Sequence, residues 1–224
     1  VWQIPADDLT LVLPLRELHT DGSELLYNFT VDWGDGTTDE VTSFGDGDKA
    51  HSYAEAGDYR VVIGGLMQGF SIANKATIKD KLVSVPNLGN LGWKDLTEVF
   101  FGCSNLRQVR GGIVDNVESL ALMFKEAPLV EPEISHWDVS NVQNMSQLLW
   151  GASLANPSLE NWDTASVIDM NNMFNDALSA TPNLGSWVTD SVTDMSGMFG
   201  DAECFDGDIS KWDVSRVTDM TAMF

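Results

Sequence analysis

Residues 212–224 read Trp-Asp-Val-Ser-Arg-Val-Thr-Asp-Met-Thr-Ala-Met-Phe, and this pattern of residue types recurs upstream at a fixed interval of 25 residues. A tryptophan begins each copy, and a methionine follows it after eight residues. The tryptophans are Trp137, Trp162, Trp187 and Trp212, and the methionines are Met145, Met170, Met195 and Met220. Self-similarity at a fixed period of this size indicates a stack of repeated structural units.

Other apolar columns keep the same interval and give each unit an apolar face. In one unit the columns hold Val167, Met170, Phe174 and Ala177, which are three or four residues apart. That spacing is typical of one face of a short α-helix. With looser matches the pattern extends back to about residue 82, which gives six units. Because such a unit cannot bury its apolar face alone, we expect the units to stack with the tryptophans and methionines in the core.

These repeats resemble the BspA-like repeat of bacterial surface proteins, a relative of the leucine-rich repeat. The resemblance rests on the pattern of residues 212–224 and covers roughly residues 82–224. It implies a leucine-rich-repeat-like α/β solenoid. It also implies a bacterial, secreted or wall-attached protein that serves adhesion and surface display rather than catalysis.

Residues 1–70 follow a different pattern, which indicates a small all-β domain. Residues 9–15, 25–33 and 58–63 are rich in β-branched and aromatic residues, as strands are. Asp-Gly and Gly-Asp pairs separate these segments and are typical of turns. We expect residues 71–81 to connect this domain to the repeats.

The N-terminal domain resembles the PKD-type immunoglobulin-like domain. The matching stretches are Val31-Asp-Trp-Gly-Asp-Gly-Thr-Thr38, His51-Ser-Tyr53 and Gly57-Asp-Tyr-Arg-Val61. The resemblance implies a β-sandwich. The expected fold class is therefore α+β in two modules, an immunoglobulin-like β-sandwich over residues 1–70 and a solenoid with a helix in each unit over residues 82–224.

The net charge of the chain excludes some classes of binding partner. Its 224 residues include 12 Lys and Arg against 34 Asp and Glu, which gives a formal net charge of −22. A field of that sign repels phosphate backbones and anionic lipid, so we expect no nucleic-acid binding. Apolar runs fall short of the roughly 18 residues that cross a bilayer, so we expect no membrane insertion.

Residues that carry catalysis form no recognisable arrangement in the sequence. The histidines, His19, His51 and His136, are spread along the chain. A Ser-His-Asp or Cys-His arrangement cannot be built from this pattern, so we expect no enzyme. Cys103 and Cys204 fall four units apart, and we expect no disulfide between them.

Two columns of aspartates admit two interpretations. One column is Asp138, Asp163 and Asp213, and the other is Asp169, Asp194 and Asp219. Carboxylates aligned on neighbouring units suit Ca²⁺. Alternatively, they cap helix starts and favour the positive end of the helix dipole. The loop with Asp32, Asp35 and Asp39 also admits two interpretations, a Ca²⁺ site or a tight turn without metal. We expect no cofactor, with Ca²⁺ as the alternative.

The N-terminal stretch Val1-Trp-Gln-Ile4 is an apolar strand candidate that Pro5 ends. An immunoglobulin-like sandwich normally has about seven strands in about 100 residues, more than residues 1–70 supply. One hypothesis is that residues 1–8, through Val1, Trp2 and Ile4, complete the sheet of a second copy and so build a pilus-like filament. The alternative is an ordinary first strand that pairs within its own chain.

Trp150 stands outside the periodic columns, at a position where other units carry Asn175 or Gly200. It is either an exposed contact residue or packing between units. From these features we expect an extracellular structural or adhesion protein that acts through protein–protein contacts and self-association. The alternative function is a monomeric module of a larger adhesin that recognises a carbohydrate or depends on Ca²⁺. The expected partners beyond a second copy are a host or cell-surface protein or a glycan.

Overall fold

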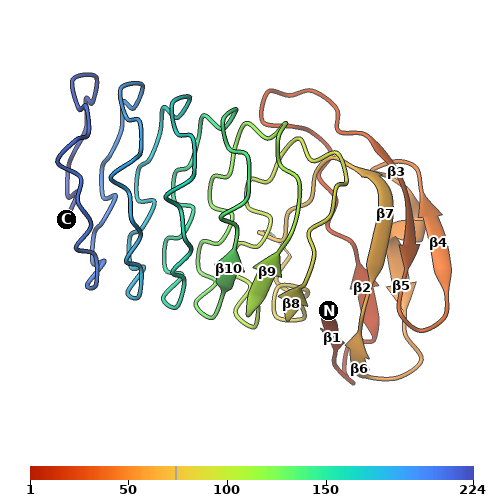
Figure 1. Ribbon diagram of the computed structural model, residues 1–224. Helices are drawn as coiled ribbons and strands as arrows, with labels where there is room; N and C mark the ends of the chain where they lie inside the picture. The colour runs from red at the N-terminus through yellow and green to blue at the C-terminus, as the bar shows by residue number, and fades with distance from the viewer. Residues whose placement is uncertain (74) are drawn as a thin grey trace.

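The computed structural model describes residues 1–73 and 75–224, and it has two regions (Figure 1). A β-rich region comes first and a stack of coils follows it. In Figure 1 the coils lie side by side, from yellow through green to blue at the C-terminus. The two regions share one hydrophobic core that runs from Trp2 to Trp212.

Small antiparallel sheets make up the β-rich region. The elements are β1 (Trp2–Ile4), β2 (Thr10–Val12), β3 (Tyr27–Asp32), β4 (Thr38–Val41), the 3₁₀ helix η1 (Gly47–Lys49), β5 (Ala50–Ser52), β6 (Gly57–Tyr59) and β7 (Val62–Met67). β3 lies between β4 and β7, while β2 pairs with β5 and β1 with β6. Alternate residues of β3 are buried, so Tyr27, Phe29 and Val31 face the core.

The N-terminal strand β1 pairs antiparallel with β6 of the same chain, with Trp2 opposite Tyr59. Trp2 is 6% exposed and Ile4 is 1% exposed, so both side chains lie in the chain's own core. The backbone of Val1 also contacts the stack, because its carbonyl accepts from the Val83 N–H at 3.0 Å. Of the two alternatives for residues 1–8, the structure shows pairing within the chain.

Parallel pairing joins the coils of the stack. β8 (Ser84–Val85), β9 (Gln108–Arg110) and β10 (Glu131–Glu133) form a parallel sheet with β9 in the middle. Single parallel bridges then join equivalent residues of successive coils. These bridges run through Ser119, Asn144, Asp169, Asp194 and Asp219. From Ser119 onward their interval is the 25-residue interval of the sequence repeat.

The described residues contain no α-helix, so the predicted α+β fold with an α/β solenoid is wrong. The segments with helical apolar spacing are chains of turns instead. We call them the turn ladder, which comprises residues 96–103, 120–127, 145–152, 170–177 and 195–202. Each segment has two residues of left-handed φ four positions apart, such as Gln147 (φ 58°) and Gly151 (φ 71°). A left-handed residue cannot continue a right-handed helix.

Hydrogen bonds between coils account for the turn ladder. Alternate backbone N–H groups of each segment donate to carbonyls of the next coil, whereas in a helix they would stay within the segment. The Phe124 N–H, for example, donates to the Leu148 carbonyl at 2.9 Å, and equivalent bonds recur in the following coils. Both conformations place apolar residues three and four apart on one side. Apolar periodicity alone therefore could not distinguish an α-helix from the turn ladder.

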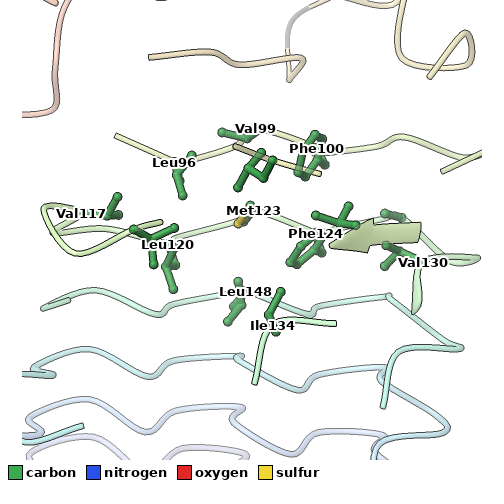
Figure 2. Close-up of a cluster of buried hydrophobic side chains, with 14 of the residues drawn as sticks. Leu96, Val99, Phe100, Val117, Leu120, Met123, Phe124, Val130, Ile134 and Leu148 are labelled. Atoms are coloured by element: carbon green, nitrogen blue, oxygen red, sulfur yellow. The ribbon is translucent and has the colours of Figure 1, made fainter. Parts of the chain in front are cut away.

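The apolar columns line the inside of the coils (Figure 2). Phe100 and Phe124 of successive coils stack with ring centroids 5.7 Å apart. The repeat tryptophans also stack: the ring centroids of Trp162 and Trp187 lie 6.5 Å apart, with 5° between the ring planes. The four repeat tryptophans are buried, as are Met145, Met170 and Met195. Met220, for which the sequence predicts a core position, is 41% exposed, because the outer side of its coil is uncovered in this structure.

Candidate binding surface

A cluster around Trp150 stands out on the turn ladder. The Nζ of Lys125 lies 3.7 Å from the centroid of the Trp150 ring and 5.8 Å from that of the Phe101 ring. The same Nζ donates to Oε1 of Gln147 at 2.7 Å. The indole Nε1 of Trp150 donates to Oδ2 of Asp176 at 3.4 Å. We call these five residues the Trp150 patch.

The turn ladder places these side chains one above another. Phe101, Lys125 and Trp150 hold equivalent positions in three successive coils, and all three are half-buried. The Glu126 N–H donates to the Trp150 carbonyl at 2.8 Å, which fixes the register of the two coils. A lysine over a tryptophan face contributes about 0.5–1 kcal/mol at an exposed site. Contacts within the chain therefore already order part of the patch.

Lys125 is followed in the sequence by a long acidic stretch. Between residues 126 and 210 the sequence has 14 Asp and Glu and no Lys or Arg. One of these acids is Asp176, an exposed member of the patch. The patch thus combines two aromatic rings and one lysine within a negative field. Such a field favours a partner whose rim is basic.

The two aspartate columns close turns. Oδ1 of Asp138 accepts from the Ser140 N–H at 3.1 Å, and Oδ1 of Asp194 accepts from the Ser196 N–H at 2.8 Å. Equivalent bonds occur at Asp163, Asp169, Asp213 and Asp219. The hydrogen bond from the Ser140 hydroxyl is the main cause that lowers the pKa of Asp138. These carboxylates therefore cap turns, where the sequence predicts helix caps.

Residues 118–224 carry most of these repeated features, and the same residues match a known family. This region is similar to the DUF285 family. The family is described as Mycoplasma protein of unknown function, DUF285. No curated protein and no solved structure matches the chain. The DUF285-like region, as we call residues 118–224, includes every member of the Trp150 patch except Phe101.

Outside the DUF285-like region, the loop around Asp35 is a turn closed by its own side chains. Oδ2 of Asp35 lies 2.7 Å from Nε2 of His51, and its Oδ1 accepts from the Thr37 hydroxyl at 2.6 Å. The bond from Thr37, followed by that with His51, lowers the pKa of Asp35 to about 2. Asp32 and Asp39 also accept hydrogen bonds within this part of the chain, at 2.9 and 2.8 Å. Across residues 1–73 and 75–224, no group of three or more His, Cys, Asp and Glu side chains is arranged to hold a metal ion.

The remaining candidates for chemistry lie apart from one another. His19 is buried, with Nδ1 3.0 Å from Oδ1 of Asp21, while His136 is exposed in the stack. Cys103 is buried and Cys204 is exposed, and both are free thiols. Burial raises the pKa of Cys103 to about 12. In the part of the chain that the structure describes, no helix has the length and apolar character to cross a membrane.

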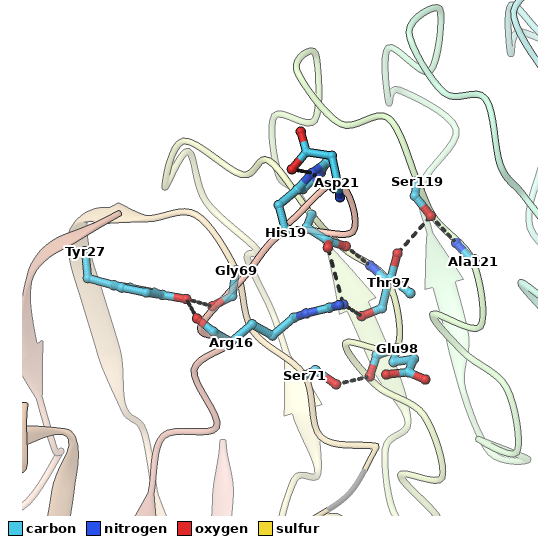
Figure 3. Close-up of polar contacts among 11 residues, drawn as sticks. Arg16, His19, Asp21, Tyr27, Gly69, Ser71, Thr97, Glu98, Ser119 and Ala121 are labelled. Atoms are coloured by element: carbon cyan, nitrogen blue, oxygen red, sulfur yellow. Dashed lines mark hydrogen bonds and ion pairs between the residues drawn. The ribbon is translucent and has the colours of Figure 1, made fainter. Parts of the chain in front are cut away.

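Sequence reasoning missed a buried ion pair where the β-rich region meets the stack (Figure 3). Nη1 of Arg16 lies 3.4 Å from Oδ2 of Asp95 and donates to the Thr97 carbonyl at 3.1 Å. The Asp95 side chain is completely buried. The hydroxyl of Tyr27 lies within hydrogen-bond distance of the carbonyls of Arg16 and Gly69, which holds the arginine backbone. Asp95 is paired with a residue far away in the sequence, so no local signal marks the pair.

Proposed function

We propose that the chain is part of a bacterial surface protein that acts by binding a protein partner and not by catalysis. The similarity of residues 118–224 to a family of Mycoplasma proteins supports a bacterial origin. The resemblance of the repeats to the BspA-like repeat supports a location at the cell surface and a role in adhesion. A strongly acidic surface is consistent with both, since it limits non-specific association.

We infer that the Trp150 patch is the binding face. The observation that carries this inference is the stacking of Lys125 on a half-buried tryptophan, with Nζ 3.7 Å from the ring centroid. Tryptophan is enriched among the residues that dominate binding energy at protein interfaces. A ring that Lys125 and Asp176 already hold loses little side-chain entropy when a partner covers it.

The test is an adhesion assay with the chain coated on fluorescent beads and a monolayer of cultured epithelial cells. Trp150→Ala is expected to reduce the number of bound beads at least tenfold. Leu178→Ala is the matched control, because Leu178 is a 38% exposed apolar side chain outside the patch. Treatment of the cells with trypsin should remove binding. Equal adhesion of the Trp150→Ala and unmodified chains would contradict this assignment.

A second candidate is a carbohydrate ligand, and one feature of the patch favours it. The Trp150 ring donates to the Asp176 carboxylate, and Lys125 on the ring donates to the Gln147 amide, so polar groups for sugar hydroxyls lie next to an apolar face. In the same assay, periodate oxidation of the cell-surface glycans would then abolish adhesion while trypsin leaves it. Loss of adhesion in EDTA would identify a Ca²⁺-dependent form of this recognition.

Self-association into a filament is a separate proposal. In it, β1 leaves β6 and pairs with a second copy, which is the mode of strand addition that the N-terminal stretch suggests. Electron microscopy of the chain with and without residues 1–6 tests it. Filaments that vanish on truncation support strand exchange. Dispersed particles from both chains contradict it.

A further inference from the structure

A cavity of about 240 Å³, lined mostly by apolar side chains and partly open to solvent, lies where the β-rich region meets the first coils. Leu13, Met67 and Phe70 line it from the β-rich region, and Leu88 and Trp93 line it from the stack. A cavity of about 150 Å³ lined by apolar side chains binds benzene. This cavity therefore has room for a molecule somewhat larger than a benzene ring.

The charge around the cavity is opposite to that of the chain as a whole. Among the described lining residues Arg60 has the one charged side chain and none is Asp or Glu, and the α-amino group of the lining residue Val1 lies near Arg60. The net charge of the whole chain is −22. An apolar site with a single guanidinium favours an anionic ligand, because arginine pairs with carboxylates in a defined geometry.

Trp93 lines the cavity and carries an unused hydrogen-bond donor, Nε1, which is itself buried. It is 3% exposed, and its Nε1 has no hydrogen-bond partner within the described part of the chain. The later tryptophans differ, since Nε1 of Trp162, Trp187 and Trp212 each donates to a carbonyl of an earlier coil at 3.0–3.2 Å. Trp93 comes after the β-rich region, which supplies no such carbonyl to it. A buried donor without a partner is unfavourable, so a ligand acceptor that reaches Nε1 after a shift of the ring would stabilise it.

We propose that this cavity binds a small apolar carboxylate, a molecule with one ring or a short alkyl chain and one carboxyl group. The apolar part fills the space between Leu13, Phe70 and Leu88. Arg60 attracts the carboxylate, and one oxygen of the ligand accepts from Trp93. This site is distinct from the Trp150 patch and does not depend on the function proposed for that patch.

Isothermal titration calorimetry with 3-phenylpropionate tests the proposal on the full chain. The unmodified chain is expected to bind the acid saturably and at least tenfold more tightly than the neutral 3-phenylpropan-1-ol. Arg60→Gln should weaken binding of the acid at least tenfold and remove the preference for acid over alcohol. Arg216→Gln is the matched control, because Arg216 is an exposed arginine outside the cavity, and it should bind like the unmodified chain.

Trp93→Phe tests the donor separately, since it keeps the ring and removes only the N–H. We expect about a threefold to tenfold weaker affinity, with an unchanged circular dichroism spectrum. The absence of saturable binding by the unmodified chain at 10 mM acid would overturn the site. Equal affinity for acid and alcohol, or unchanged binding by Arg60→Gln, would overturn the assignment of an anionic ligand.

Discussion

The Asp95 side chain is buried in the first coil, and its Oδ2 lies 3.4 Å from Nη1 of Arg16 in the β-rich region. Removal of one partner from a buried pair leaves an uncompensated charge, at a cost of about 3–5 kcal/mol. Arg16→Met should therefore lower the free energy of unfolding by that amount in urea titrations. Arg16→Met combined with Asp95→Asn should be less destabilised, because the asparagine can still accept from the Thr97 N–H.

Arg110→Met is the control for this comparison. Arg110 also forms an ion pair, with Glu133, but both side chains are largely exposed. Exposed pairs contribute about 0–1 kcal/mol, so this change should be nearly neutral. If Arg16→Met and Arg110→Met reduced stability equally, the buried pair at the junction would not stabilise the chain.

Asp35 links the stability of the β-rich region to acidic pH. Its pKa is lowered from 3.8 to about 2, first by the hydrogen bond from Thr37 and then by that with His51. A carboxyl whose pKa is lower in the folded chain contributes stability above pH 3.8, and that stability is lost as the pH falls toward 2. Urea unfolding followed by circular dichroism should therefore show that the unmodified chain loses stability more steeply with falling pH than the Asp35→Asn chain does.

In Asp35→Asn the unfolding free energy should be lower at pH 6 and should change less between pH 4 and pH 2. Glu203→Gln, which removes an exposed carboxyl of the last coils, should keep the steep acid loss. An Asp35→Asn profile parallel to that of the unmodified chain would show that this carboxyl is not the linked group.

Gly151 distinguishes the turn ladder from the helix that the apolar spacing predicts. In a helix interior, Gly→Ala stabilises by about 0.5–1 kcal/mol. In the turn ladder Gly151 has φ 71°, and an added Cβ would meet nothing closer than 3.7 Å, so the backbone conformation alone decides the effect. A left-handed non-glycine residue costs about 1–2 kcal/mol. We expect Gly151→Ala to destabilise the chain by that amount in urea titrations.

Gly45→Ala is the control, because Gly45 has open space around it and its φ is not left-handed. It should change the unfolding free energy little. A stabilising effect of Gly151→Ala would mean that residues 145–152 form a helix after all. The sign of the change is therefore enough to decide between the two conformations.

The same segment shows how far the sequence could predict this molecule. The 25-residue interval of Trp162, Trp187 and Trp212 was visible in the sequence, and in the structure these rings are buried and stacked. The backbone conformation between them could not be predicted, because it depends on N–H groups that bond to the next coil, and apolar spacing does not indicate such bonds.

For the Trp150 patch, the sequence identified only Trp150 as a candidate contact residue. Lys125 could be assigned to it only after the register of the coils was known.

A single core passes through both regions of the molecule, so we expect the two regions to depend on each other for stability. The Met67 N–H donates to the Leu91 carbonyl at 2.8 Å, and Nζ of Lys94 donates to Oγ of Ser23 at 2.9 Å. Leu96 of the first turn-ladder segment is fully buried. Stacked repeats need a terminal unit with a polar outer face to remain soluble, and the β-rich region supplies that unit here.

We therefore expect the two ends of the chain to respond differently to truncation. A chain of residues 71–224 exposes the apolar side of the first coil and loses the Arg16 partner of Asp95, so it should aggregate without a cooperative thermal transition. A chain of residues 1–199 loses about one coil, whose side chains are mostly exposed already, and should keep a cooperative transition. Size-exclusion chromatography and thermal circular dichroism measure both outcomes. If the 71–224 chain were monomeric with a cooperative thermal transition, the stack would fold without the β-rich region. The shared core would then be an interface between two independent domains.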